Sequence, residues 1–195
     1  MPTFDDITQT MKRAVALLRD ADIEHALGGS MAAWAHGGPP VCSDVDIVLR
    51  PADAERALET LTDDGFEAER PPEGWLLKAH HGDVLVDLIF EPNGLDVEQT
   101  LARAPTLSVL SVDMKVITVD DVLITKLLAF EEHYIDFVSL LPIARALREQ
   151  ADWERVRACT SQSAIAVGFF AMAEALGIVA PAGAERQQRI RVSTA

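Results

Sequence analysis

The spacing of apolar residues changes in character along this chain of 195 residues. Near its start, Phe4, Ile7 and Met11 recur at helical spacing, and Thr3 followed by Asp6 is typical of a helix start. Short apolar runs and glycine-containing turns come next, and beyond residue 119 the spacing is helical again. Strands mixed with helices are therefore expected first and a helical cluster second, which predicts an α+β (mixed α/β) fold.

The pattern also predicts where most elements lie and how the chain divides. In the first part we expect a helix from residue 4, a strand at 23–27, a short helix at 31–36, a strand at 41–49, a helix at 51–63, a hairpin of 75–79 with 84–90, and a strand at 115–119. The second part predicts helices at 120–130, 135–148, 153–159 and 164–176. We interpret residues 1–118 as a core, 119–180 as a helical region packed on it, and 181–195 as a flexible tail.

Composition and charge narrow the class of protein. The chain is 49% hydrophobic and 25% charged, as globular domains are, and 17 basic against 31 acidic residues leave a net charge of −14. Such a surface does not attract nucleic acid unless basic residues gather locally, and it favours a metal, a basic partner or a small cationic substrate. With no signal peptide, no membrane-spanning stretch and only two distant cysteines, the sequence predicts a cytoplasmic protein without a membrane partner.

Three aspartates occupy positions that need an explanation. Asp44 and Asp46 lie two residues apart in a predicted strand, so both carboxylates point to the same face. Asp87 interrupts an apolar run, where an unpaired carboxylate would cost several kcal/mol or be forced to protonate. Carboxylates that converge on one face repel one another unless a cation lies among them, and their hard oxygens suit Mg²⁺. The alternative is that Asp44 and Asp46 form an exposed strand end and Asp87 pairs with an arginine.

A glycine turn precedes the aspartates. Gly28, Gly29 and Ser30 follow a predicted strand and come before a short helix, where backbone amides can approach a phosphate. This is not a Walker loop, because no Gly-Lys-Ser/Thr follows. A plain strand-to-helix turn would explain the glycines, but it would not explain the paired aspartates that come after them.

Taken together, these motifs resemble the nucleotidyltransferase superfamily of the DNA polymerase beta type. The shared pattern is a Gly-Gly-Ser turn, an Asp-x-Asp strand and a third acid in a later strand. Thirteen residues separate Ser30 from Asp44, which is similar to the AbiE-type toxin branch that includes the mycobacterial MenT toxins. In that branch a helix bears a lysine, here Lys126, and an aspartate, here Asp136, begins the next helix. The resemblance covers about residues 20–150 and implies a minimal nucleotidyltransferase core.

The resemblance also implies roles for these residues. Asp44 and Asp46 would hold one or two Mg²⁺ ions against a nucleoside triphosphate (NTP), and Asp87 would complete the metal site and help to deprotonate the acceptor. The remaining residues would bind the triphosphate: Gly28, Gly29, Ser30 and Lys126. Asp136 would be a functional aspartate, although a helix cap explains it equally well. Lys78 could reach the phosphates, but at the end of a strand we expect it on the surface.

Three functions remain open at this point. The first, which we predict, is transfer of a nucleotide to a tRNA 3′ end by the toxin of a toxin–antitoxin pair, because the C-terminal helices favour it although the acidic charge disfavours it. The second is transfer to a small molecule such as an aminoglycoside, which suits an acidic pocket. The third is a catalytically silent domain that binds a nucleotide or a partner protein. The presence of all three aspartates argues against the third.

Overall fold

The computed structural model describes residues 2–40 and 43–181, and it has the α+β architecture predicted from the sequence. Its centre is a five-stranded sheet in the order β1-β2-β5-β4-β3. The strands are β1 (His25–Leu27), β2 (Val45–Leu49), β3 (Glu67–Glu69), β4 (Leu76–His81) and β5 (Val84–Ile89). Strands β2 and β5 are parallel, and the other neighbours are antiparallel. Strands β6 (Thr106–Val109) and β7 (Val112–Lys115) form a separate hairpin.

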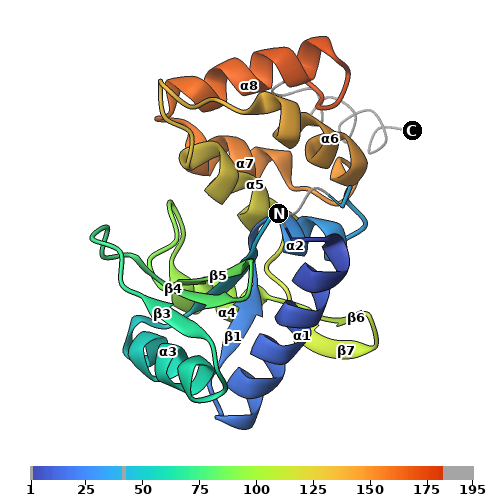
Figure 1. Ribbon diagram of the computed structural model, residues 1–195. Helices are drawn as coiled ribbons and strands as arrows, with labels where there is room; N and C mark the ends of the chain where they lie inside the picture. Colours follow the sequence, from blue (N-terminus) through green and yellow to red (C-terminus); the bar gives the residue numbers. More distant parts are fainter. Residues whose placement is uncertain (1, 41–42, 182–195) are drawn as a thin grey trace.

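Helices α1 (Phe4–Asp20) and α3 (Ala54–Asp63) cover one face of this sheet (Figure 1). A short 3₁₀ turn, Pro51–Asp53, leads into α3, and α1 begins with the predicted capping box between Thr3 and Asp6. Alternate residues of β2 and β5, such as Ile47 and Leu88, are fully buried beneath the apolar sides of these helices. The other residues of the same strands must therefore face the opposite side, where the aspartates lie.

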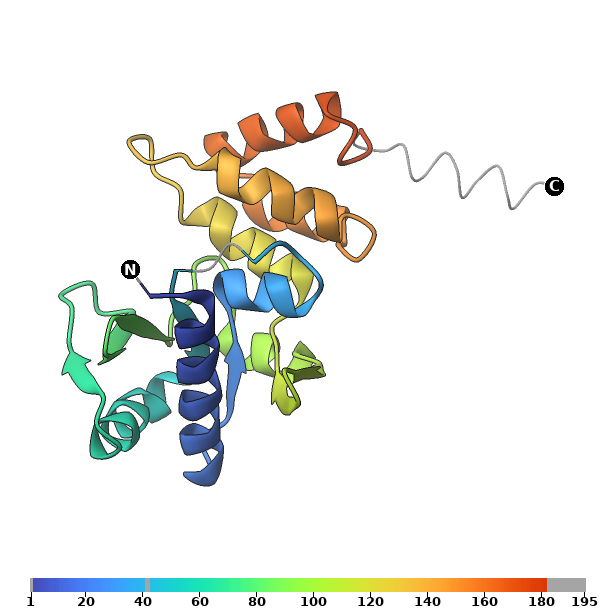
Figure 2. The ribbon, with the colours of Figure 1, turned by 45° about the vertical axis from the view of Figure 1, so that its right-hand side comes forward.

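The predicted helical region is present beyond residue 118. It consists of α5 (Val119–Leu128), α6 (Phe137–Leu147), α7 (Trp153–Thr160) and α8 (Ala164–Ala175). Phe137, Phe169 and Phe170 pack edge to face within it, and this fills the space between α6 and α8. These helices lie at one end of the sheet, beside α2 (Gly29–Ala35), as Figure 2 shows. In the part of the chain that the structure describes, no helix is long and apolar enough to cross a membrane.

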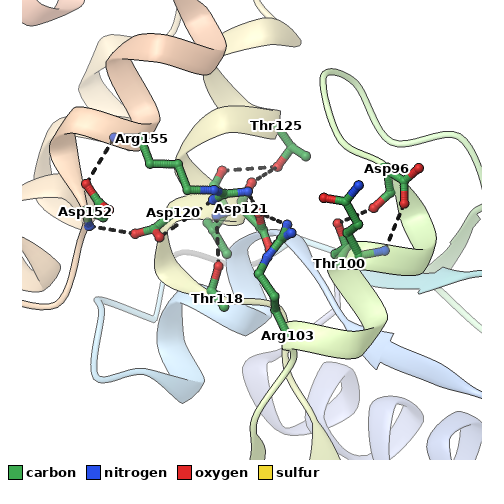
Figure 3. A network of polar contacts seen from close by, with 11 residues as sticks. Asp96, Thr100, Arg103, Thr118, Asp120, Asp121, Thr125, Asp152 and Arg155 are labelled. Carbon is green, nitrogen blue, oxygen red and sulfur yellow. Dashed lines mark hydrogen bonds and ion pairs between the residues drawn. The ribbon is translucent and has the colours of Figure 1, made fainter.

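A buried ion-pair network ties α5 to its neighbours α4 (Val97–Arg103) and α7 (Figure 3). The carboxylate of Asp121 is completely buried and accepts hydrogen bonds from Arg103 (3.0 Å) and Arg155 (2.6 Å). Arg155 also pairs with Asp120 at 3.6 Å, and Asp120 accepts a hydrogen bond from the backbone of Asp152 (2.8 Å). Two arginines thus neutralise one buried carboxylate at the point where the helical region meets the rest of the chain.

Some predicted elements differ from the observed ones. The strand expected at 115–119 was wrong: β7 ends at Lys115, Val116 makes a single bridge to Leu27, and Val119 already begins α5. The hydroxyl of Thr118 accepts a hydrogen bond from the Asp121 amide, which stops any strand there. Strand β2 begins at Val45, so Asp44 precedes it, and residues 41–42 of the predicted strand lie outside the described residues.

Four short elements were not predicted from the sequence: β3, α4, β6 and β7, the last sharing only Lys115 with the expected strand. Each has three to seven residues and little apolar periodicity, and all three residues of β3 are exposed. The proposed tail cannot be described, since residues 182–195 lie outside the described part.

Candidate active site

The two aspartates of the central strands stand side by side on the sheet face that α1 and α3 leave open. Asp46 of β2 is opposite Asp87 of β5 in the parallel register. The row continues to Lys78 of β4, which is opposite Asp87, and then to Glu69 of β3. On the other side, the backbone amide of Gly28 donates to the carbonyl of Asp46 at 2.8 Å. The fold therefore lines up the glycine turn and two of the predicted acids in one cross-strand row.

Burial and like charge perturb both carboxylates. Burial, followed by the nearby charges of Asp44 and Asp87, raises the pKa of Asp46 to about 7. Burial also raises the pKa of Asp87, while the ammonium of Lys78 acts in the opposite direction. One buried oxygen of Asp87, Oδ1, finds no hydrogen-bond donor among the described residues. These carboxylates are thus less well satisfied than ordinary buried aspartates.

Lys78 lies inside this site, in contrast to the surface position expected from the sequence. Its Nζ is 3.5 Å from Oδ1 of Asp87, and the two side chains are 26% and 17% exposed. The expected four-residue turn would have placed Leu76, rather than Lys78, opposite Asp87. The observed turn contains only Gly82 and Asp83, with Gly82 at a φ of 58°, so His81 pairs with Val84 and Lys78 meets Asp87.

The glycine turn is packed directly against Asp46. Gly29 has a φ of 53°, and a Cβ atom at this position would overlap the Asp46 carboxylate. Only a glycine therefore allows the start of α2 to lie this close to the acid. The neighbouring Ser30 hydroxyl accepts a hydrogen bond of 2.9 Å from Nζ of Lys126, which belongs to α5. The structure thus brings together the predicted turn, the predicted lysine and the predicted acid.

A pocket of about 200 Å³ opens next to these groups. Asp46, Gly29 and Lys126 form its charged end, and Val48 and Ile89 line it further along the same strands. Its remaining lining residues come from three loops and α5: Trp75, Pro92, Asn93, Ile117, Thr125 and Ala129. Trp75, which is 37% exposed, was not singled out from the sequence as a site residue. The pocket therefore combines a charged end with an apolar, aromatic end.

Asp44 and Asp136 lie at the margin of the site. Asp44 is half-buried just before β2, close enough for its charge to act on Asp46. Asp136 caps α6: its carboxylate accepts a 3.0 Å hydrogen bond from the Ser139 amide. Hydrogen bonds from Ser139 lower the pKa of Asp136, with a smaller contribution from the charge of Lys126. The helix-cap interpretation of Asp136 is therefore realised in the structure.

The carboxylates suit a divalent cation only in part as they stand. Within residues 2–40 and 43–181, no group of three or more His, Cys, Asp or Glu side chains is arranged to hold a metal ion. The predicted trio is thus represented by the in-register pair Asp46 and Asp87, with Asp44 adjacent. The pair offers hard oxygen donors, negative charge that Lys78 compensates only in part, and Oδ1 of Asp87, which accepts no hydrogen bond from the described residues. These properties fit Mg²⁺.

Solved structures share this arrangement of strands and helices. The crystal structure of ANT(2")-Ia in complex with adenylyl-2"-tobramycin has a TM-score of 0.59 at 12% identity, covering 83% of this chain and 97% of that one. The solution structure of the antibiotic-resistance factor ANT(2")-Ia gives 0.55 at 14% identity, over 87% and 97% of the two chains. Lincomycin-bound LnuA, a lincosamide antibiotic adenylyltransferase, gives 0.53 at 12%, over 69% and 92%. The chain has a nucleotidyltransferase-like fold.

This nucleotidyltransferase-like fold agrees with the sequence-based prediction at the level of the fold. None of these three structures supports the finer assignment to the AbiE-type toxin branch. No protein-family model matches the sequence, and no curated protein matches it either. At identities of 12–14% the shared fold leaves the substrate undetermined.

Proposed function

We propose that this protein is a Mg²⁺-dependent nucleotidyltransferase that transfers a nucleoside monophosphate from an NTP to a small, positively charged acceptor. The observation that carries the proposal is the in-register pair Asp46 and Asp87, beside which Lys126 contacts Ser30 at 2.9 Å. Buried, poorly compensated carboxylates next to a lysine and a glycine turn provide both a cation site and a phosphate site. A purely structural aspartate pair would not require the second of these.

Each group has a distinct part in the proposed reaction. Asp46 and Asp87, with Asp44 beside them, would hold Mg²⁺, which when bound neutralises the triphosphate and stabilises the leaving pyrophosphate. Lys126 and Ser30 would bind phosphate oxygens, and the open backbone at Gly29 lets those oxygens come close. The apolar end of the pocket, with Trp75 and Val48, would hold the nucleobase.

The chemical step is a substitution at phosphorus. The acceptor oxygen attacks the α-phosphorus, its proton passes to a carboxylate, and the bond between the α-phosphorus and the bridging oxygen breaks to release pyrophosphate. Asp87 is the proton acceptor that we favour, because burial raises its pKa and one of its oxygens lacks a partner. Lys126 would compensate charge on the departing phosphates.

Two observations favour a small cationic acceptor over tRNA. The net charge of −14 opposes binding of the long, highly charged backbone of a nucleic acid but suits a cationic acceptor. In addition, the C-terminal helices no longer favour a tRNA-modifying toxin over a small-molecule transferase. The match to ANT(2")-Ia covers 83% of the chain, more than the predicted core of residues 1–118 can account for. The similarity to the antibiotic-resistance factor ANT(2")-Ia, seen in complex with adenylyl-2"-tobramycin, therefore includes part of the helical region.

A tRNA 3′ end remains a second candidate acceptor. It is favoured by the placement of two residues that the AbiE-type resemblance implied: Lys126 contacts the Ser30 hydroxyl, and Asp136 begins α6. Under this alternative the protein would be a toxin with a cognate antitoxin as its partner.

The decisive experiment is a transfer assay with Mg²⁺, each labelled NTP in turn, and separate pools of aminoglycosides, other cationic small molecules and total tRNA. The expected result is label on a cationic small molecule with the wild-type protein and none with Asp46→Asn. Label on tRNA would replace the proposed acceptor with the second candidate. Triphosphate binding without transfer to any pool would instead favour a silent nucleotide-binding domain.

A further inference from the structure

Lys78 has an unusual position for a lysine, because it lies in the middle of a strand and at the edge of a proposed metal site. Its side chain is 26% exposed, and Nζ lies 3.5 Å from Oδ1 of Asp87. The other carboxylate next to it in the sheet, Glu69, is already bound to His80 at 2.8 Å. Asp87 is therefore the anion with which Lys78 is paired.

The pair compensates charge without satisfying the hydrogen bonds of Asp87. Although Lys78 lies at ion-pair distance, Oδ1 of Asp87 accepts no hydrogen bond from the described residues. The other lysine of the site, Lys126, donates instead to Ser30. Lys78 thus supplies positive charge beside Oδ1 of Asp87, an oxygen that accepts no hydrogen bond from the described residues.

We propose that Lys78 is a built-in counter-ion that takes the electrostatic place of the metal in the free protein and thereby weakens metal binding until a triphosphate arrives. This inference rests on the proposed function, because it requires that Asp46 and Asp87 hold a divalent cation. A cation bound between those two residues would lie next to the Lys78 ammonium, since the three residues share one cross-strand row. Like charges at such a separation repel appreciably in a partly buried site.

A triphosphate would remove this repulsion. Its oxygens offer Lys78 a second anionic partner and add negative charge beside the metal, so metal and nucleotide would bind with positive coupling. The consequence is an order of binding: the metal alone binds weakly, and the metal with a triphosphate binds well. The flexible four-carbon stem of lysine allows its ammonium to turn from the carboxylate to a phosphate.

The test measures Mn²⁺ binding directly, without any transfer reaction. The full chain, freed of metal, would be titrated with Mn²⁺ by equilibrium dialysis, with and without inorganic triphosphate on both sides of the membrane, so that only Mn²⁺ held by the protein is counted. The variants are Lys78→Met, Lys78→Arg and Lys12→Met. Lys12→Met removes the same charge from α1, on the opposite side of the sheet. Circular dichroism and melting temperature would confirm that each variant is folded.

The expected result is that Lys78→Met binds Mn²⁺ alone roughly tenfold more tightly than the wild type. The further gain on adding triphosphate should be smaller in this variant, while Lys78→Arg and Lys12→Met should resemble the wild type. Unchanged or weaker binding by Lys78→Met would overturn the inference, as would Lys78→Arg that binds as tightly as Lys78→Met.

The two proposals fail in different ways. If the wild type binds Mn²⁺ with triphosphate and the Lys78 variants do not differ from it, only the counter-ion role is lost. If no form binds Mn²⁺ under either condition, the metal site of the proposed function is lost as well.

Discussion

The molecule withdraws aspartates from solvent in two regions, completely at Asp121 and in part at Asp46 and Asp87, and it treats them in opposite ways. Asp121, at the start of α5, has no exposed surface, and its oxygens accept hydrogen bonds from two arginines. Asp46 and Asp87, in the central strands, share a single ion pair with Lys78, and one of their oxygens has no hydrogen-bond partner among the described residues. The first arrangement joins helices, and the second leaves negative charge available.

The difference teaches how a structural carboxylate can be distinguished from a functional one. A buried charge that is fully paired stabilises a particular packing. Removing one of its partners leaves a buried charge without compensation, which strongly destabilises the fold. A buried carboxylate whose partners are incomplete is costly to the free protein, and a ligand can repay that cost. Both kinds appear in the sequence as an acid among apolar residues, so the sequence pattern alone does not separate them.

The largest expected effect concerns Asp46 in the candidate active site. Asp46→Asn should lower nucleotidyl transfer by at least roughly 10³-fold, because it removes charge from the proposed metal and phosphate site. The melting temperature of the metal-free protein should stay the same or rise, since the variant relieves repulsion by Asp44 and Asp87. Steady-state kinetics and thermal denaturation would measure both, with the exposed Asp113→Asn as the control. A variant that keeps its activity would show that Asp46 has a structural role only.

Replacing Asp121, which is fully paired, should instead lower stability. Asp121→Ala leaves Arg103 and Arg155 without their shared buried partner, and it should lower the free energy of unfolding by about 3–5 kcal/mol. Urea denaturation would measure this loss, and Asp113→Ala serves as the exposed control. A triple replacement of Asp121, Arg103 and Arg155 by leucine should recover much of the stability. A loss below about 1 kcal/mol in Asp121→Ala would mean that the network contributes little to joining the helices.

A smaller effect should appear in the pH dependence of stability. Folding raises the pKa of Asp46 from 3.8 to about 7, so between these values the folded state binds a proton more tightly than the unfolded state does. Stability of the metal-free protein from this group is therefore greatest at low pH and declines as the pH rises from about 4 to 7. Asp46→Asn should flatten that decline, by roughly 2–4 kcal/mol across the window. Melting curves of both proteins at several pH values would measure this. If stability declines equally with pH in the wild type and in Asp46→Asn, the raised pKa of Asp46 does not contribute.

The smallest expected effect is at Asp136. Asp136→Ala should lower the melting temperature slightly through loss of the α6 cap, whereas Asp136→Asn keeps an oxygen that can accept the Ser139 hydrogen bond. For a small-molecule transferase we expect Asp136→Asn to retain its activity. A strong loss of transfer in this variant, at unchanged stability, would indicate a functional aspartate and strengthen the AbiE-type alternative.

The sequence predicted those parts of the fold in which apolar residues recur with a clear period. The capping box at Thr3, the helical region and the position of Asp87 in a buried strand all follow from local pattern. The elements that were missed, such as β3, are short and depend on their neighbours. The strand expected at 115–119 failed because apolar Val116 and Ile117 form an extended link, which the Thr118 cap ends.

Much of the candidate site could also be predicted from the sequence. The exception is the set of residues whose position depends on the strand register. The proximity of Gly29, Asp46 and Lys126 matched the motif-based expectation. Lys78 was misplaced because a turn two residues longer than the observed one would put Leu76 opposite Asp87. Trp75 gave no signal because its place in the pocket depends on how the loops before β4 and after β5 approach each other.

Helix α5 connects the two regions: Asp121 of the ion-pair network lies near its start, and Lys126 of the candidate site lies near its end. This arrangement has a mechanical consequence. Asp121 anchors its first turn, and Lys126 lies about one and a half turns later, against Ser30 of α2. A short helix of this kind moves as a rigid unit, so Lys126 cannot shift without displacing the anchored end. A triphosphate held between Ser30 and Lys126 would clamp the helical region onto the sheet, and the slowed hydrogen exchange of α5 amides would record how firmly it does so.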